Sequence, residues 1–343
     1  MVQFKQESGQ TRSGNITIIN TTNQWMISPV KKTIWKGTKL KIYTGIYYAQ
    51  TAYWKDCGIF VVGNPSINIE NQTISLPLYD KFAMLDGTIG GKRAYEYRIS
   101  RGCAVEQAIK NCLSEKSDGG KSFDSKSIIF PYKYMFPNEA KTTYDIIKDP
   151  NMTMGELIIE LATNINCVVS YNNLGNLVVE PTIITNDDFK EKPIQWNYND
   201  NDRCYSYPTM DIDFNNLINK IIVAGAIENG EQYKAEITNE SPLSQANVYL
   251  TEPNPLYIED GNIISDDYCM QRAKYEMVKQ GRLSAQLKFK SFYIPHLECN
   301  NLILFTNKEL GFFNELFVIN SISINPNYYM DISATSVNEV SFK

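Results

Sequence analysis

The stretch Asn71–Gly91 constrains the fold most, because two kinds of periodicity meet in it. It opens with apolar residues at every second position, which predicts a strand with one buried face: Ile74, Leu76 and Leu78. Residues at helical spacing follow, which predicts a short helical turn: Tyr79, Phe82, Ala83 and Leu85 or Asp86. Asp86-Gly87 and Gly90-Gly91 then supply residues that tolerate positive φ. The stretch therefore predicts a junction between two structural units, and it contains no obvious catalytic side chain.

The residues before this junction read as β structure. Residues 15–20, 40–46 and 59–62 are apolar or alternating segments separated by close turns, which is typical of a small barrel or sandwich. We predict a first β-barrel-like domain over residues 1–94. Residues 1–14 are polar, and we expect a partner to be needed to order them.

The pattern changes after Gly91. Residues 103–113 place Val105, Ile109 and Cys112 on one helical face. A second helix has a capping box, Thr153 with Glu156 three residues later, followed by an apolar stripe: Leu157, Ile158, Leu161, Ala162 and Ile165. A hairpin over residues 167–180 follows, turning at Asn172–Gly175. We predict a helix-and-hairpin α+β insertion module over residues 95–200.

The last part returns to β structure. Residues 196–213 are polar and are expected to connect two modules, whereas residues 218–226 and 233–238 read as paired strands. A helix ending at Gly281 is expected to turn several side chains inward: Tyr268, Met270 or Gln271, Tyr275 and Val278. Strands follow over residues 284–292, 301–306, 317–324 and 330–337. We predict a second β-rich barrel-like domain with one helix over residues 201–343, in a chain that is mainly β.

Composition argues against several functions. The formal net charge of −5 provides no basic stripe for gripping nucleic acid. Seven separated cysteines without a CxxC indicate neither a zinc site nor a disulfide framework, and the one histidine, His296, is expected to be structural. Gly120-Lys121-Ser122 looks like the end of a P-loop, but Glu115 stands where its first glycine is required. No apolar run reaches bilayer length, and the N-terminus lacks a signal-peptide core. We predict no catalytic, cofactor-binding or metal-binding residues.

Three strings resemble a known family: LYDKFAMLDGTIGG, MTMGELIIELATNINCVVSYNNLGNLVVEP and NLINKIIVAGAIENGEQYKAEITNESPL. The chain resembles bacteriophage tail baseplate hub proteins of phages and phage-tail-like particles of Gram-positive, clostridial-type hosts, over residues 36–324. The resemblance implies a homotrimer in which each subunit gives two β-barrel-like domains to a ring. Such a ring adapts a hexameric tail tube to a trimeric central spike or tip, alongside other baseplate proteins.

The resemblance further implies a virion structural protein, assembled in the host cytoplasm, that is not an enzyme, needs no cofactor and inserts into no membrane. DNA would only pass through its channel, whose wall could carry acidic residues near turns: Asp86, Asp187, Asp188, Glu228, Glu259 and Asp260. We expect Phe82→Asp to prevent folding or ring assembly, and charge changes at Lys81 or Lys92 to be mild.

Two other functions stay open. A glycosidase needs only two carboxylates, although no pair is marked in the sequence. A carbohydrate-binding or adhesin-type module is favoured by Trp25, Trp35 and Trp54, which could form stacking platforms. Barrel core and subunit interface are the alternative roles of these tryptophans.

Overall fold

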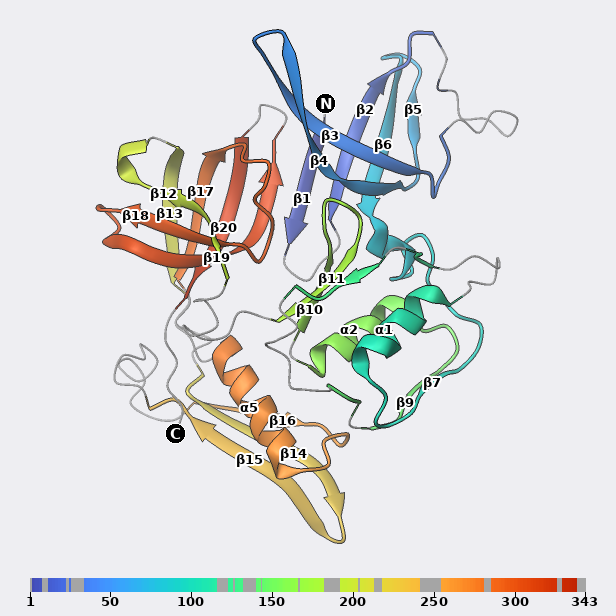
Figure 1. Ribbon diagram of the computed structural model, residues 1–343, viewed down its shortest axis with the longest axis vertical. Helices are drawn as coiled ribbons and strands as arrows, with labels where there is room; N and C mark the ends of the chain where they lie inside the picture. Colours follow the sequence, from blue (N-terminus) through green and yellow to red (C-terminus); the bar gives the residue numbers. More distant parts are fainter. Residues whose placement is uncertain are drawn as a thin grey trace.

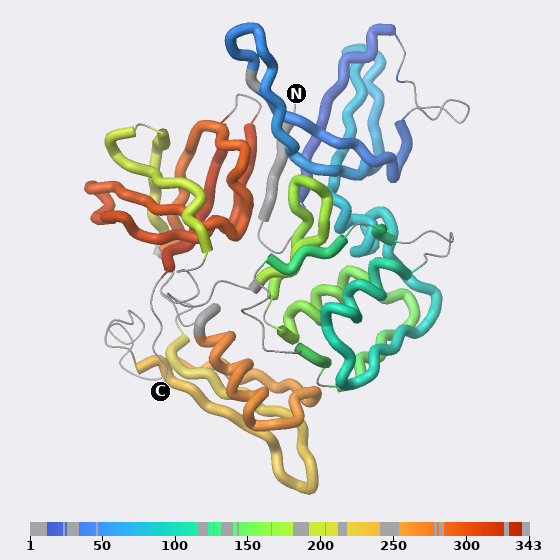
Figure 2. The backbone as a smooth tube through the Cα atoms, viewed as in Figure 1, coloured from blue at the N-terminus to red at the C-terminus, as the bar shows by residue number. Residues whose placement is uncertain are grey.

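The protein is seen here in a computed structural model (Figures 1 and 2). The structure describes residues 2–7, 12–22, 25, 34–115, 123–125, 127–131, 140–142, 144–165, 167–181, 192–202, 204–212, 218–240, 254–280, 285–325 and 329–337. The chain forms two β units, a helix-hairpin module and a smaller sheet that carries one helix (Figure 1).

The N-terminal β unit contains five strands: β2 (Ser13–Ile19), β3 (Lys39–Tyr48), β4 (Thr51–Val62), β5 (Ser66–Asn68) and β6 (Thr73–Asp80). β6 pairs with β2, β4 and β5, and its buried residues alternate with half-buried ones. The alternation predicted at Ile74, Leu76 and Leu78 is confirmed, because all three side chains are fully buried in the core of this unit. η1 (Lys81–Met84) follows directly, as the helical spacing predicts.

The C-terminal β unit is built from six strands: β12 (Ile194–Tyr198), β13 (Tyr205–Ile212), β17 (Ala285–Phe292), β18 (Leu302–Asn307), β19 (Phe312–Ile324) and β20 (Tyr329–Ser336). β1 (Val2–Glu7) lies between the two β units and pairs antiparallel with β2 on one side and with β19 on the other. A single twelve-stranded sheet therefore runs through both units.

The expectation that residues 196–213 form a polar connection is wrong, because β12 and β13 occupy most of this stretch. Tyr198 of β12 is fully buried, and its ring centroid lies 4.8 Å from that of Phe289. Its hydroxyl donates a 3.0 Å hydrogen bond to Ser291. These partners are about a hundred residues away in sequence, so local polarity concealed them.

The helix-hairpin module contains α1 (Val105–Ser114), α2 (Met154–Thr163) and five short strands: β7 (Tyr97–Ile99), β8 (Ile128–Ile129), β9 (Ile146–Lys148), β10 (Cys167–Tyr171) and β11 (Leu177–Pro181), with β7 pairing β9. Both hydrogen bonds of the predicted capping box are present, between Thr153 and Glu156. The predicted helical stripes and hairpin are also confirmed, because their apolar residues form one shared core.

The α5 module holds the remaining elements: β14 (Lys220–Glu228), β15 (Glu231–Thr238), β16 (Pro255–Glu259) and α5 (Asp266–Gln280). Its strands form a separate sheet in the order β15-β14-β16. The helix is present as predicted, but its inward face is partly different. Cys269, Ala273 and Met277 are fully buried, whereas Tyr268 is 44% exposed. Small side chains allow α5 to lie close to Gly225 of β14, which sequence periodicity alone does not reveal.

None of the sheets closes into a barrel within the strands that the structure describes. η3 (Asp200–Asp202) is a short 3-10 turn after β12. No described helix combines the length and apolar character required to cross a membrane. The Gly120-Lys121-Ser122 string lies outside the described residues.

Candidate functional site: a polar junction between three units

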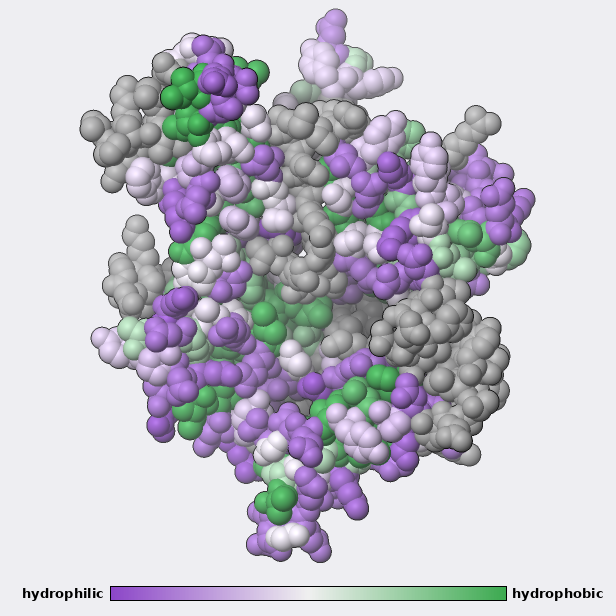
Figure 3. All heavy atoms as spheres, turned by 180° about the vertical axis from the view of Figure 1, so that it is seen from behind, coloured by the Kyte–Doolittle hydropathy of each residue, from purple (hydrophilic) through white to green (hydrophobic). Residues whose placement is uncertain are grey.

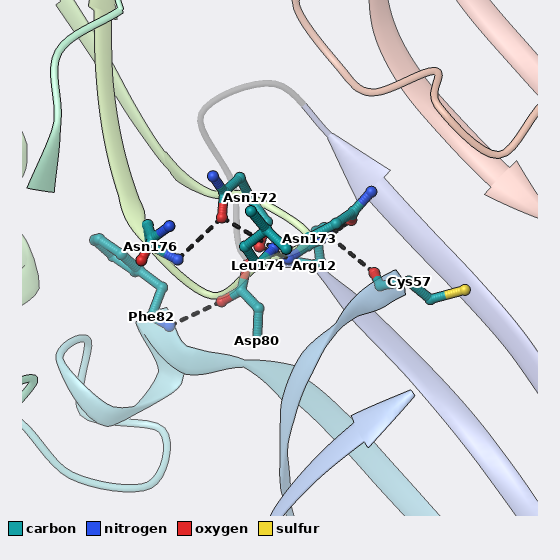
Figure 4. A network of polar contacts seen from close by, with 8 residues as sticks. All are labelled: Arg12, Cys57, Asp80, Phe82, Asn172, Asn173, Leu174 and Asn176. Carbon is teal, nitrogen blue, oxygen red and sulfur yellow. Dashed lines mark hydrogen bonds and ion pairs between the residues drawn. The ribbon is translucent and has the colours of Figure 1, made fainter. Parts of the chain in front are cut away.

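A buried polar cluster joins the two β units to the helix-hairpin module, and we call it the central junction (Figure 4). It consists of Arg12, Cys57, Asp80, Asn172 and Asn173, with their contacts. Arg12 stands directly before β2, Cys57 lies in β4, Asp80 ends β6, and the two asparagines form the β10–β11 turn. The predicted junction at residues 71–91 is thus one side of a larger contact.

Arg12 is the centre of this cluster and is only 5% exposed. Its Nη1 donates to the backbone oxygen of Cys57 at 3.2 Å and to Oδ1 of Asn173 at 2.5 Å. Its Nη2 donates to the backbone oxygen of Asn172 at 2.9 Å. The guanidinium carbon lies 5.4 Å from the centre of the Phe60 ring. Because bonds from a charged donor are among the stronger ones, Arg12 fixes the hairpin turn against β4.

Asp80 holds the backbone of the same region. Its Oδ2 accepts a 2.8 Å hydrogen bond from the backbone N–H of Arg12, and its Oδ1 accepts a 2.9 Å bond from that of Phe82. The second bond caps η1, which explains why β6 turns into a helical element at this residue. Burial raises the pKa of Asp80 to about 6, while the Arg12 charge and both hydrogen bonds act against this shift.

A second buried ion pair lies beside the junction. The ammonium group of Lys81 contacts Oδ2 of Asp124 and donates to the backbone oxygen of Gly175 at 2.9 Å. The hydroxyl of Tyr171 donates to the same carboxylate oxygen at 2.9 Å, and the Tyr171 ring lies 4.9 Å from the Lys81 ammonium. Burial, reinforced by Asp124, raises the pKa of Tyr171 well above its usual value. This network ties η1 to the hairpin.

Because Lys81 is buried, a substitution that changes its charge is no longer expected to have a mild effect. Its side chain is 3% exposed, whereas Lys92 lies on the surface, so the two lysines differ in environment. The only feature of the local sequence that points to the Lys81–Asp124 ion pair is a lysine within the apolar turn LYDKFAML. Asp124 and Arg12 lie in polar stretches whose sequence gives no comparable indication.

The C-terminal β unit reaches the junction through its β17–β18 loop. Tyr293 places its hydroxyl 3.6 Å from the sulfur of Cys57. Glu298 accepts a hydrogen bond from the backbone of Asn173, and burial raises the pKa of this carboxyl group although Arg12 lowers it. Lys192 adds a bridge by donating to the backbone oxygen of Asn300, with Glu180 at 3.5 Å. Burial lowers the pKa of Lys192.

A small cavity remains between the three units. Its walls include Arg12, Phe60, Tyr293, Glu298 and Ile324. Its volume is about 40 Å³, which is room for a few water molecules. Water here can bridge Arg12 to its neighbours, but a sugar or nucleotide is far too large. The junction is therefore suited to holding units together rather than to binding a substrate.

Burial keeps four of the cysteine thiols protonated. All seven cysteines are free thiols. Burial raises the pKa of Cys112 to about 12 and raises the pKa of Cys57, Cys167 and Cys269, which keeps these thiols protonated. His296 lies on the surface, with Nε2 3.2 Å from the backbone oxygen of Gln195. Within the described ranges, no group of three or more potential ligands could hold a metal ion.

The tryptophans named from the sequence do not gather at one place. Trp25 packs on the core of the N-terminal β unit, Trp35 is 43% exposed, and Trp54 is 69% exposed on the β3–β4 hairpin. The acidic residues near turns are also spread over separate elements. Asp86 is half-buried after η1, Glu228 and Glu259 are exposed in the α5 module, and Asp187 and Asp188 lie outside the described residues.

Solved structures of phage tail proteins are similar to this chain over nearly its full length. A 43 kDa tail protein of prophage MuSo2 from Shewanella oneidensis is similar over 98% of this chain and 93% of its own, with 14% identity and a TM-score of 0.61. A tail protein from Neisseria meningitidis MC58 is similar over 97% of this chain and 91% of its own, with 10% identity and a TM-score of 0.67. The fold is that of phage tail proteins.

A third similar structure comes from a secretion system. The Escherichia coli c3393 protein, a component of the type VI secretion system, is described as structurally similar to the T4 bacteriophage tail proteins gp27 and gp5. It covers 98% of this chain and 72% of its own, with 9% identity and a TM-score of 0.55. In sequence, residues 240–339 match a domain of unknown function, DUF5048. No curated protein matches the chain.

Proposed function

We propose that this chain is the structural hub of a phage tail or of a phage-tail-like particle, including tail-like bacteriocins. The observation that supports this most is the structural similarity of nearly the whole chain to phage tail proteins. A fold shared at 10% to 14% identity argues for a common architecture, and the architecture suits a building part. We infer a non-enzymatic role from the same likeness to tail proteins.

We infer a homotrimeric ring with pseudo-sixfold symmetry. Each chain carries two β units, and β1 joins them into one continuous sheet. Three chains therefore offer six β units to a hexameric tail tube, while the ring keeps threefold symmetry for a trimeric central spike or tip. In such a ring the β units act as the barrel-like domains, and neighbouring subunits cover sheet edges that are open in the single chain.

The central junction supports this role mechanically. A symmetry adaptor works only if the two β units of one chain keep a fixed spacing and angle. Arg12, Asp80 and Lys192 supply contacts between segments 68 to 161 residues apart. Buried, charge-assisted hydrogen bonds of this kind define one arrangement, because any other leaves a buried charge unpaired.

The proposed hub role also implies where the protein is located and which proteins it contacts. The protein works in the virion, at the tail baseplate or tail tip, after assembly in the host cytoplasm. Its partners are the tail tube, the spike and other baseplate proteins, and DNA passes through the channel without being bound. The formal net charge of −5 favours such passage, because an acidic wall repels phosphates.

Sedimentation of the pure full-length chain tests the ring. We expect a species of three times the chain mass of 39.2 kDa, alone or after addition of the spike protein. Averaged electron-microscope images of that species should show six similar densities around a channel. A chain that stays monomeric with its spike and tube partners present contradicts the proposal.

A carbohydrate-binding or adhesin-type module of a phage tail is the second candidate, and one observation favours it. Trp54 and several tyrosines are exposed on the β3–β4 hairpin, where aromatic faces could stack on sugar rings. A glycan array and binding to purified cell wall distinguish the two. Saturable binding by a monomer that Trp54→Ala abolishes would favour the adhesin.

A further inference from the structure

The β3–β4 hairpin extends beyond the sheet that carries it, and we call residues 43–56 the arm (Figures 1 and 3). β3 and β4 pair with each other along their full length, but β6 pairs with β4 only at Phe60–Val62. Neither edge of the arm has a partner strand among the described strands. At about 3.3 Å per residue the arm is about 20 Å long, which is enough to reach across onto a neighbouring molecule.

The arm carries a dense set of exposed aromatic side chains. Their exposed fractions are 50% for Tyr43, 75% for Tyr47, 71% for Tyr48, 56% for Tyr53 and 69% for Trp54. The pairing register places Tyr43, Tyr47 and Trp54 on one face of the hairpin and Tyr48 and Tyr53 on the other. Together these rings leave about 600 Å² uncovered. A partner that contacts both faces of the hairpin can therefore cover most of the roughly 800 Å² that one side contributes to a standard protein interface.

The opposite end of the sheet is built differently. β13 is the other edge strand, and it carries Pro208, a register shift between Ser206 and Thr209, and a positive φ at Tyr207. Proline and bulges protect an edge against pairing with another chain. β3 and β4 contain no proline over residues 39–62. The β3–β4 pair has a register shift between Ile42 and Tyr43, at the base of the arm, but its pairing is regular from Tyr43 to Tyr48. The arm is therefore less protected against a partner than the β13 end of the sheet.

The charge of the arm and its base selects the partner. Residues 39–62 contain Lys39, Lys41 and Lys55 against Asp56 alone, a net charge of +2. The whole chain carries −5, so the remainder carries −7. The arm itself holds only Lys55 and Asp56, so the excess positive charge lies at its base, and the net negative charge of the rest of a second copy favours contact there. We propose that the arm docks on a second copy of this chain, whose remaining residues are net acidic, and so links successive subunits, a role that rests on the proposed ring.

The double variant Tyr47→Glu/Tyr48→Glu tests the arm by sedimentation over a range of concentrations. Both tyrosines are well exposed at the tip, so circular dichroism and melting should match the unmodified protein. We expect trimer formation to weaken at least 100-fold, because two anchoring aromatic rings are replaced by acids facing a net acidic partner. Tyr95→Glu is the matched control, since Tyr95 is 72% exposed in the helix-hairpin module, and it should leave the trimer unchanged.

Zero-length carbodiimide crosslinking gives an independent measurement. In a mixture of isotopically labelled and unlabelled chains, the exposed Lys55 should join carboxylates of a different copy. A folded double variant that trimerises like the unmodified chain overturns the docking proposal and leaves the ring intact. If that variant trimerises but no longer assembles into particles, the arm binds another tail protein instead. An unmodified chain that never trimerises overturns the ring itself.

Discussion

Replacing Lys81 by methionine should strongly destabilise the helix-hairpin module. The side chains of Lys81 and Asp124 are 3% and 4% exposed, so the substitution removes the cation from a carboxylate that has almost no water. Breaking a buried pair on one side costs about 3–5 kcal/mol. The variant Lys81→Met/Asp124→Asn removes both charges and keeps an acceptor for Tyr171. Its remaining cost should be about 1–2 kcal/mol, mainly from the backbone oxygen of Gly175 that loses its donor.

Hydrogen exchange of the β10–β11 amides measures this effect locally, which suits a chain of several units. A loss of about 4 kcal/mol accelerates exchange through opening of the module by roughly a thousand-fold. The double variant should recover most of that protection. Lys92→Met, at an exposed lysine nearby, should change stability by no more than about 0.5 kcal/mol. An acceleration below tenfold in Lys81→Met, in a folded protein, would refute the reasoning about the buried pair.

Three further predictions concern residues 71–91. Phe82→Asp should leave the chain insoluble or monomeric, since Phe82 is 8% exposed in the core of the helix-hairpin module, and a soluble trimer in sedimentation would contradict this. Folding raises the pKa of Asp80 from 3.8 to about 6, so its stabilising contribution is complete below pH 3.8 and is lost as pH rises through 6. The difference in unfolding free energy between the native chain and Asp80→Asn, measured by chemical denaturation, should thus fall from pH 4 to pH 7. A difference that stays constant or rises over this range would contradict the prediction. Gly91→Ala should lower the unfolding free energy by about 3 kcal/mol, because φ is +98° and a Cβ would lie 2.2 Å from the backbone oxygen of Leu85. Gly102→Ala is the control: its φ is +80°, but a Cβ there meets no atom within 4 Å, so the cost should be about 1 kcal/mol. Thermal unfolding of the two variants measures the difference.

The elements that the sequence predicts well are those whose hydrogen bonds and burial are local. The capping box of Thr153 and Glu156 closes within one helical turn. The alternation of β6 and the turn at Asn172–Gly175 likewise depend on neighbours a few residues away. In such segments side-chain spacing and backbone preference determine the structure before distant residues contribute, so the chain reveals them directly.

The central junction was predicted only in part, because its contacts join residues far apart in the sequence. Residues 71–91 show that a strand gives way to a helical turn, but not what the turn contacts. Arg12 meets Asn173 across 161 residues, and Lys81 meets Asp124 across 43. A charged side chain in sequence looks like solvated surface, because its usual state is exposed and its burial depends on a partner elsewhere. β12 was missed because its stretch is polar, and Tyr198 becomes buried only when Phe289 of β17 and Phe305 of β18 pack beside it.

The sequence by itself therefore determined the class of the protein: mainly β, with a capped helix and hairpin inserted after the stretch at residues 71–91. Tertiary structure alone decided that β1 joins the two β units, that α5 belongs to a separate sheet, and that Arg12 and Lys81 hold the junction at residues 71–91. Local periodicity fixes which face of an element is apolar, whereas long-range pairing chooses the element that covers it.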